Sequence, residues 1–450
     1  MQDHLILGSG LAGLSCSYHI GHERCLILEK NAHAFGHIHS ELRDGFTWDQ
    51  GPHVSFTKHD YVRELFARNV AGEYIEQEVK TANYFHGSWI DHPAQSNLYQ
   101  VPEPLRTSCL ESFLSSREDA PSDPSHYGEW LDAAFGKVFA ETFPYAYTRK
   151  YWTVEPAEMT TDWVGKRVFK PDIKDVREGA LGNLGRQTHY IQSIRYPQTG
   201  GYQSFAREMR KDANILFNCG VLRIDLQRKK LWTADGRDFT WNKLVNTIPL
   251  PVFLSLCTDT PADVLDAAAT LSCSSVHLVN VVANHPTLRH ENWMYVYDED
   301  KFSTRINCTE KLSPHNGPEG KSGVQVEVYH SRHKPLTSDP QLIQKQVIDE
   351  LVEMGLVLSS DITGLHGVHC PWANVIFTHE TKPALDAIWK WLEGHGLQRE
   401  EEDLDPTTDW SRSPSTPYGE LTMAGRFGQW KYFWTDDCVL RGSQIAGFTP

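Results

Sequence analysis

The chain has 450 residues, more than one hydrophobic core normally serves, so two or three interlocked domains are expected. Its formal net charge of −15 argues against nucleic acid or an anionic membrane as the main partner. Nine widely spaced cysteines without a CxxC motif are typical of reduced thiols, so we expect no disulfide framework and no metal site. No apolar run is long enough for a membrane span and the mean hydropathy is −0.46, so a cytoplasmic location is expected.

The first 29 residues follow the pattern of a dinucleotide-binding unit. An apolar strand, a glycine-rich turn, a helix, a second apolar strand and an acid succeed one another. Gly8 permits the tight turn, Gly10 lets the backbone approach a pyrophosphate, and Gly13 lets the helix pack closely on the strand. The helix N-terminus offers free N–H groups to phosphates. Glu29, at the end of the second strand, is expected to accept hydrogen bonds from a ribose diol.

This pattern fits either FAD or NAD, and residues 31–56 favour FAD. They carry a glycine turn at Gly36 and the run Asp49-Gln-Gly-Pro-His53, and they resemble FAD enzymes of the amine-oxidase and UDP-galactopyranose mutase superfamily. His37 stands where that superfamily usually has a second glycine, and Pro52 stands where the mutases usually have a glycine. The histidines of this loop have no carboxylate or cysteine to complete a metal site, so we interpret them as polar loop residues.

The middle of the chain alternates between helical and strand-forming patterns. Residues 57–135 are expected to be mostly helices and loops, and the aromatic segment 143–168 is either a core between helices or an aromatic-lined ligand cleft. Residues 214–250 predict a β-meander whose last strand rejoins the dinucleotide sheet. Residues 274–286 and 322–333 predict strands of a second, antiparallel sheet.

These patterns predict an α/β fold with a discontinuous Rossmann-type FAD-binding domain, an antiparallel β-sheet substrate domain and a helical insertion. We expect the FAD-binding domain to comprise residues 1–80, 200–255 and 410–450. The mainly helical insertion, with the substrate cleft, is expected at residues 81–199. The sheet domain is expected at residues 256–409.

The order of the segments resembles that of the UDP-galactopyranose mutases over nearly the whole chain. The resemblance implies that His53 lies beside the isoalloxazine ring and that Arg167 and Arg305 hold a diphosphate, and these three are the implied catalytic residues. The substrate-binding residues that it implies are Gln95, Trp152, Tyr295 and Tyr432. The family's tyrosine from a late substrate strand has no clear match here, which leaves sugar selection open.

The segment 424–447 is unusually rich in aromatic, charged and glycine residues for the end region of a sequence. It begins Ala-Gly-Arg-Phe-Gly-Gln-Trp-Lys-Tyr and resembles the terminal motif of the mutases. In that family the segment closes over the flavin and meets the substrate pyrophosphate. The resemblance therefore implies that Gly425, Arg426 and Asp436 contact the cofactor.

The resemblance implies a flavin-dependent isomerase that interconverts pyranose and furanose forms of a nucleotide-diphosphate sugar such as UDP-galactose. Reduced flavin N5 would be the nucleophile, and NAD(P)H is a possible reductant. The alternative is an FAD-dependent oxidase or dehydrogenase of the amine oxidase or protoporphyrinogen oxidase type, which shares the Tyr-Pro-x-x-Gly-Gly turn at residues 196–201. Such enzymes do not need two arginines facing the flavin. A flavin-bound scaffold is a third hypothesis, and the oligomeric state is open.

Overall fold

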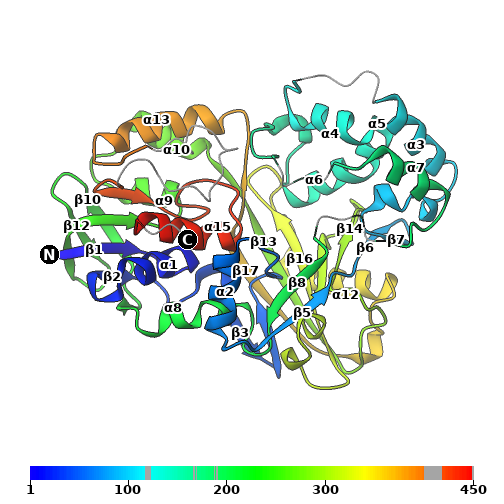
Figure 1. Cartoon of the computed structure of the whole chain (residues 1–450), viewed down its shortest axis with the longest axis horizontal. Coiled ribbons are helices and arrows are strands. Elements are labelled where there is room, and N and C mark those ends of the chain that lie inside the picture. The colour runs from blue at the N-terminus through cyan, green and yellow to red at the C-terminus, as the bar shows by residue number, and fades with distance from the viewer. Residues whose placement is uncertain are drawn as a thin grey trace.

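The protein has a mixed α/β fold built on two large sheets, as the sequence predicted. The computed structural model describes residues 1–116, 123–165, 168, 170–186, 188, 191–399 and 418–447. Figure 1 shows the dinucleotide-binding unit at the left, a group of helices at the upper right, and the second sheet in the lower centre and right.

The first sheet is the dinucleotide-binding sheet, and its parallel strands have the order β18-β12-β1-β2-β9. An antiparallel meander, β10-β11, pairs with the beginning of β12, which confirms the pattern predicted for residues 214–250. The alternating side chains of β1 are buried on both faces, because helices cover both. The strands are β1 (Gln2–Leu7), β2 (Cys25–Leu28), β9 (Ile215–Leu216), β10 (Val221–Asp225), β11 (Lys230–Thr233), β12 (Asp238–Asn246) and β18 (Leu421–Met423).

Helices from distant parts of the sequence cover this sheet. One face packs against α1 and α15, and the other against α9, α10 and α13. Helices α10 and α13 fall within residues 256–409, which were expected to form the sheet domain, but their apolar sides belong to the dinucleotide core. The helices around this sheet are α1 (Leu11–Ile20), α2 (Asp60–Asn69), α8 (Arg207–Lys211), α9 (Leu250–Leu256), α10 (Ala262–Thr270), α13 (Thr381–Glu393) and α15 (Thr435–Ile445).

The second sheet has the strand order β17-β13-β16-β15-β14-β6-β7, and every pairing except β14–β6 is antiparallel. Helix α12 (Pro340–Glu353) and its following turn pack on one face of it. The two strands expected at 274–286 and 322–333 are confirmed as β13 and β16. The strands are β6 (Thr81–Phe85), β7 (Ser88–Asp91), β13 (Ser272–Ala283), β14 (Trp293–Val296), β15 (Arg305–Cys308), β16 (Ser322–His330) and β17 (Ile362–Ile376).

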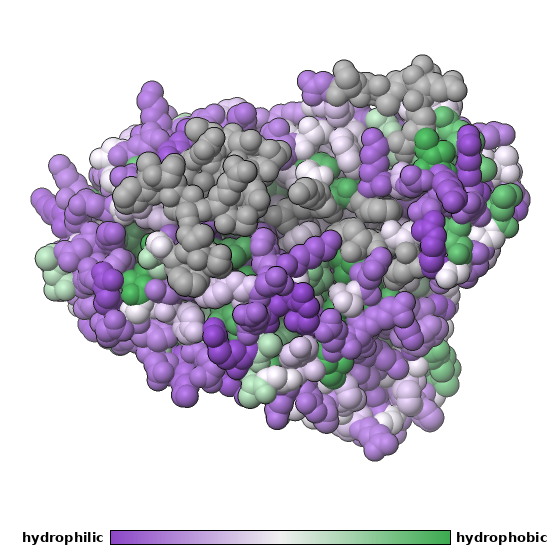
Figure 2. Space-filling model, viewed as in Figure 1, coloured by the Kyte–Doolittle hydropathy of each residue, from purple (hydrophilic) through white to green (hydrophobic). Residues whose placement is uncertain are grey.

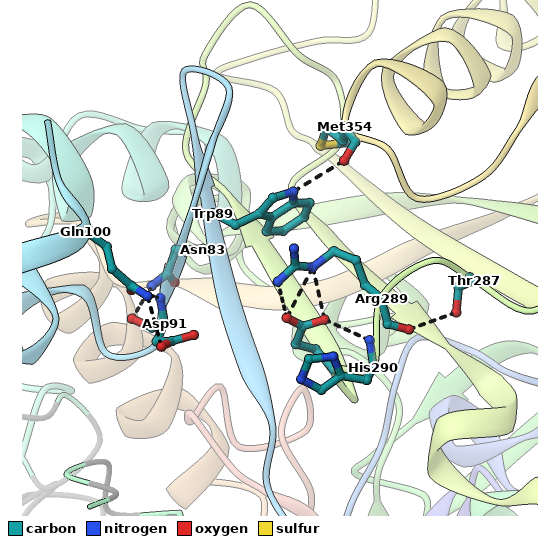
Figure 3. Close-up of polar contacts among 9 residues, drawn as sticks. Asn83, Trp89, Asp91, Gln100, Thr287, Arg289, His290 and Met354 are labelled. Atoms are coloured by element: carbon teal, nitrogen blue, oxygen red, sulfur yellow. Dashed lines mark hydrogen bonds and ion pairs between the residues drawn. The ribbon is translucent and has the colours of Figure 1, made fainter. Parts of the chain in front are cut away.

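Residues 81–91 form the last two strands of this sheet, whereas the sequence placed them in the helical insertion. Figure 3 shows how they are held. The indole N–H of Trp89 donates to the main-chain oxygen of Met354 at 3.3 Å, and the guanidinium of Arg289 lies 4.1 Å from the centre of the indole ring. Arg289 also pairs with both carboxylate oxygens of Glu291. These tertiary contacts stabilise a short hairpin whose own sequence pattern is weak.

The helical insertion therefore begins after residue 91 and surrounds an aromatic core. A one-turn π-helix at Glu141–Tyr145 joins two of its helices around Pro144. Outside the large sheets lie one hairpin, one antiparallel pair of strands from distant parts of the sequence, and a short helix. The elements are α3 (Leu105–Ser115), α4 (Tyr127–Phe135), α5 (Lys137–Ala140), α6 (Ala146–Tyr151), α7 (Ile173–Leu181), α11 (Thr309–Leu312), the pair β3 (Ser40–Arg43) and β4 (Phe46–Asp49), and the pair β5 (Tyr74–Glu78) and β8 (Ser193–Pro197).

Among the described helices, none is long and apolar enough to cross a bilayer. Figure 2 shows mostly hydrophilic side chains on the visible face, with apolar residues in separate patches. All nine cysteines are free thiols, seven of them buried.

The contact between α1 and α15 gives a test of the packing that closes the first sheet. Gly442 lies so close to α1 that an added Cβ would be 2.6 Å from the main-chain carbon of Ser15. We expect Gly442→Ala to lower the free energy of unfolding by about 1–3 kcal/mol, because backbone cannot move aside cheaply. Gly182→Ala is the matched control, since nothing lies within 4 Å of its Cβ position. Chemical denaturation measures both, and equal stabilities would contradict this packing.

Candidate functional site

A large internal cavity of about 910 Å³ runs between the dinucleotide sheet, the second sheet and the helical insertion. Its walls come from the β1–α1 loop, the loop after β4, helix α6, strands β14 to β16, the end of β17 and the segment before α15. This volume suits a large cofactor together with part of a substrate. The cavity therefore collects the functional residues that the sequence scattered over the chain.

The β1–α1 loop forms a cradle with little room for side chains. Gly8 has φ of +96°, and a Cβ on Gly13 would lie 2.1 Å from the carbonyl oxygen of Gly8. Gly10 is the N-cap residue of α1, and no side chain caps the helix there. The first N–H groups of the helix therefore remain open to an anion. A Cβ on Gly36 would lie 2.9 Å from the Cα of Gly10, which brings the predicted second turn onto the same cradle.

Glu29 lies in the cavity wall at the end of β2 and is only 5% exposed. Its Oε2 accepts hydrogen bonds from the main chain and hydroxyl of Ser9, at 2.9 and 2.7 Å. Its Oε1 accepts from the main-chain N–H of Asn31 at 2.9 Å. These contacts hold the carboxylate in place beside the cradle, which fits the predicted role in binding a ribose diol.

The segment before α15 closes the cavity from the other side. Gly425 has φ of +80°, and a Cβ there would lie 2.9 Å from the Cβ of Ala12. Arg426 lines the cavity, but it donates through Nε and Nη2 to the carbonyl oxygen of Phe433, at 2.9 and 2.6 Å, and through Nη1 to that of Ala373 at 3.0 Å. Arg426 thus joins this segment to β17. Asp436 also lies in the wall and is 8% exposed.

His53 lies in the cavity wall after β4, and its Nδ1 is 2.9 Å from the carbonyl oxygen of Gly51. A carbonyl only accepts, so Nδ1 carries the proton and Nε2 has a free lone pair in the neutral ring. Burial lowers the pKa of His53 to about 3, and the nearby positive charge of Arg426 acts in the same direction. His53 is therefore neutral at physiological pH and can accept a hydrogen bond but cannot supply a positive charge.

Arg305 enters the cavity from β15 and pairs with Glu327 of the neighbouring strand β16. Its Nη2 donates to Glu327 Oε1 at 2.8 Å, and Nε donates to Oε2. Burial would lower the pKa of Arg305, but the carboxylate raises it above the ordinary value. The guanidinium also lies 6.0 Å from the centre of the Tyr151 ring. The pair places a permanent cation in the cavity and largely balances its charge.

Aromatic rings form the wall between the helical insertion and the second sheet. Trp152 lies at the end of α6, 5.3 Å from Tyr432 between ring centres. Tyr295 lies 5.5 Å from Tyr147, and its hydroxyl oxygen is 2.9 Å from the indole nitrogen of Trp293. The aromatic segment thus serves both predicted purposes, because some of its rings fill the core of the insertion and others line the cavity.

All the predicted site residues that the structure describes, Gln95 among them, line the cavity except Gly13. Gly13 packs behind the cradle. Arg167 lies outside the described residues. The sequence reasoning missed Glu327 and the pair Tyr147 and Tyr151. A signal existed for each, because polar residues alternate in β16 and the two tyrosines are four residues apart on one helix. Within the described residues, no group of histidine, cysteine or acidic side chains could hold a metal ion.

Comparison with known proteins gives the family. The model of the flavin-containing amine oxidoreductases matches residues 11–442. The chain belongs to the flavin-containing amine oxidoreductase family. Curated 4,4'-diapophytoene desaturases of Staphylococcus aureus are 27% identical over 126 residues, which is 25% of this chain. The match covers 24% of the length of those desaturases.

Solved structures of this fold include enzymes of different reaction classes. A reduced UDP-galactopyranose mutase superimposes with a TM-score of 0.87 at 21% identity, covering 99% of this chain and 95% of that one. A putative protoporphyrinogen oxidase from Exiguobacterium sp. 255-15 has a TM-score of 0.72 at 15% identity, and cyclohexylamine oxidase from Brevibacterium oxydans IH-35A has 0.68 at 14%. Both cover 99% of this chain and 98% of their own. These likenesses establish the shared fold.

Family membership implies a flavin cofactor, and the cavity fits one. The uncapped start of α1 and the tight glycine contacts suit a pyrophosphate, and Glu29 suits a ribose. The wall beyond the cradle is wide and largely aromatic, as a planar ring system needs.

The lowered pKa of His53 predicts how the stability of the protein depends on pH, and this dependence tests the site. Burial holds the folded pKa of His53 near 3, against 6.5 unfolded, so the unfolded chain binds more protons at mildly acidic pH. Stability contributed by the neutral ring is full above about pH 6.5 and falls as pH drops toward 3. We expect the thermal midpoint of the apoprotein to fall from pH 7.5 to 5, with a smaller fall in His53→Asn. Exposed His285→Asn is the control and should match the wild type.

Proposed function

We propose that the protein is a flavin-dependent mutase that interconverts pyranose and furanose forms of a nucleotide-diphosphate sugar, with FAD as its cofactor. The observation that carries this proposal is the partly buried guanidinium of Arg305 in the same cavity as the dinucleotide cradle. A diphosphate that departs from the anomeric carbon gains negative charge, and a fixed cation stabilises that charge best where water is excluded. The fold shared with a UDP-galactopyranose mutase supports the same assignment.

The residues of the cavity divide into two functional groups under this proposal. Arg305, with Arg167 by sequence pattern, holds the diphosphate, and the hydroxyls of Tyr295 and Tyr432 add hydrogen bonds. Trp152 and Gln95 also line the cavity, and under this proposal they contact the nucleoside. Stacking on aromatic rings suits the planar base of a nucleotide.

The cofactor contributes the covalent chemistry. When bound and reduced, the flavin supplies a nucleophilic nitrogen for the anomeric carbon. The protein orients the sugar against it and excludes water. His53, neutral with a lone pair on Nε2, accepts a hydrogen bond in the wall of this region. The Arg305–Glu327 pair keeps a cation available without leaving an unbalanced charge in the unliganded cavity.

A second candidate is an oxidoreductase that acts on an apolar or amine substrate. One observation favours it: Glu327 already balances the charge of Arg305, and much of the surrounding wall is aromatic. A balanced pair has less need of an anionic ligand. The oxidases that share this fold make the hypothesis concrete.

The redox requirement of turnover separates the two candidates. A mutase of this type needs reduced flavin and produces an isomer without net oxidation, because its nucleophile exists only in the reduced state. We expect dithionite-reduced protein to convert UDP-galactopyranose into the furanose isomer and oxidised protein to be inactive. Chromatography of the nucleotide sugars measures conversion, and an oxygen electrode runs in parallel. Oxygen uptake by the oxidised enzyme with an amine or apolar substrate, without isomer, would replace the mutase by the oxidoreductase.

Binding of the diphosphate gives an independent test at Arg305. We expect Arg305→Ala to weaken UDP binding by about 2–5 kcal/mol in calorimetry, because a buried charge-assisted contact is lost. Truncation also leaves Glu327 unpaired, so the Arg305→Ala/Glu327→Gln double variant removes both charges together. The double variant should recover stability but still bind UDP weakly. Arg228→Ala is the surface control, since its side chain is 80% exposed. Wild-type affinity in the double variant would exclude a diphosphate contact at Arg305.

A further inference from the structure

Lys150 is a buried lysine in the helix that carries part of the aromatic wall of the cavity. It lies on α6 with Tyr147 and Tyr151, which line the cavity, whereas Lys150 itself does not. Lys150 is only 2% exposed. A lysine is almost never buried to this extent unless its amino group is paired. The partners of this amino group therefore indicate what Lys150 does.

The amino group of Lys150 joins α6 to the segment that connects β14 with β15. Its Nζ donates to the main-chain oxygens of Asp298 and Ser303, at 2.6 and 2.7 Å. Asp298 follows β14, which carries Tyr295, and Ser303 precedes β15, which begins with Arg305. Tyr295 and Arg305 lie directly opposite each other in the β14–β15 pair. One side chain thus connects a helix of the cavity wall to the hairpin that carries two proposed substrate contacts.

A buried acid binds the N–H groups of the same connecting segment. Glu350 of α12 is 4% exposed and accepts hydrogen bonds from the main-chain N–H groups of Phe302 and Ser303, at 2.8 and 2.9 Å. The segment therefore has carbonyl oxygens bound to Lys150 and N–H groups bound to Glu350. These contacts fix its position relative to both α6 and α12.

The hydrogen bonds of Lys150 do not depend on its charge. Burial lowers the pKa of Lys150 to about 7, although the negative charge of Glu350 acts in the opposite direction. A charged amino group has three N–H donors and an uncharged one has two. Two donors are enough for the carbonyls of Asp298 and Ser303. The connection between α6 and the hairpin is therefore present in both protonation states.

Ring contacts between α6 and the hairpin leave their spacing less well defined. Tyr147 lies edge-on to Tyr295, with 5.5 Å between ring centres. The ring of Tyr151 has its centre 6.0 Å from the guanidinium carbon of Arg305. Such contacts tolerate sliding, whereas hydrogen bonds are directional. The two buried hydrogen bonds of Lys150 are therefore suited to define this spacing.

We propose that Lys150 is a positioning residue that sets the spacing between the aromatic wall on α6 and Arg305 on β15. A ligand that contacts both walls then depends on Lys150, although Lys150 does not touch it. Under the proposed function this ligand is a nucleoside diphosphate, with its base at Trp152 and its diphosphate at Arg305. In the identity of the ligand, the inference rests on the proposed function.

Hydrogen exchange of the FAD-bound protein tests the connection without a substrate. We expect Lys150→Met, which has no donor, to speed amide exchange about tenfold in peptides that cover residues 146–151 and 297–304. Peptides of β13 should exchange as in the wild type. The matched control is Arg149→Ala on the same helix, since its ion pair with Glu299 is partly exposed and such pairs contribute little. Unchanged exchange in Lys150→Met, or faster exchange throughout the molecule, would overturn the inference.

Ligand titration distinguishes positioning from a general loss of structure. We expect Lys150→Met to raise the dissociation constant of UDP about tenfold in calorimetry, because UDP contacts both walls. Uridine lacks the diphosphate and contacts only the aromatic wall, so its dissociation constant should change less than about twofold in an NMR titration. Equal losses of affinity for UDP and uridine, or wild-type affinity for UDP, would exclude the positioning role.

A second variant keeps both experiments informative. Lys150→Gln retains an N–H donor on a side chain one bond shorter, and it replaces Lys150→Met if that variant does not fold. Its changes should have the same direction and a smaller size. A wild-type protein that binds neither UDP nor uridine, while the variant shows the localised exchange, would contradict the mutase and leave the positioning role standing. The two failures are therefore distinguishable.

Discussion

The return of residues 421–445 to the first sheet is the constraint on which the site depends. Strand β18 pairs in parallel with β12, so that Leu421 lies beside Leu244, and α15 then packs on α1. This docking places Gly425 against the first turn of α1 and lets Arg426 reach the end of β17. The dinucleotide unit and the second sheet are therefore joined at the wall of the cavity. A change in this docking would move the cradle and the substrate wall together.

The way in which the cationic side chains of the cavity are held is a second feature of the site. Arg305 and Arg426 approach the same region as His53, whose pKa is lowered by burial and, to a smaller extent, by these two positive charges. Glu327 pairs with Arg305, whereas Arg426 is held by main-chain carbonyls. A buried cation held by carbonyl dipoles keeps more of its field than one paired with a carboxylate. The positive potential of the site therefore extends toward the cofactor cradle as well as toward a substrate.

The sequence predicted those parts of the fold that depend on local pattern. The glycine turn before α1 and the acid at Glu29 follow from short-range spacing, and the long strands β13 and β16 follow from apolar content. Residues 81–91 were misplaced because β6 and β7 owe their position to Trp89 and its partners in another segment. Helix α13 lies within the range expected to form the sheet domain, but its apolar side packs in the core of the dinucleotide-binding sheet, which the sequence pattern did not indicate.

The site was predictable to the extent that single residues matched known motifs. The alternation within β16 marks Glu327 as a residue of one face of the strand, but its partner Arg305 follows only from the pairing of β15 with β16. His37 is the clearest example, since the sequence suggested a polar loop histidine and the structure places it in the cavity wall. The ring that it packs on, Phe427, lies more than 300 positions further along the chain. No local pattern could have revealed that contact.

The position of β18 and α15 so late in the chain has a consequence for biosynthesis. Until residues 421–423 have left the ribosome, Leu244 to Asn246 of β12 form an open parallel edge, and the face of α1 that α15 covers is exposed. The edge of β12 stays open while more than 170 further residues are made, and the face of α1 stays uncovered while more than 400 are made. Such a long-range closure is slow and exposed to misassembly. Chaperone binding during synthesis would have its target at this edge.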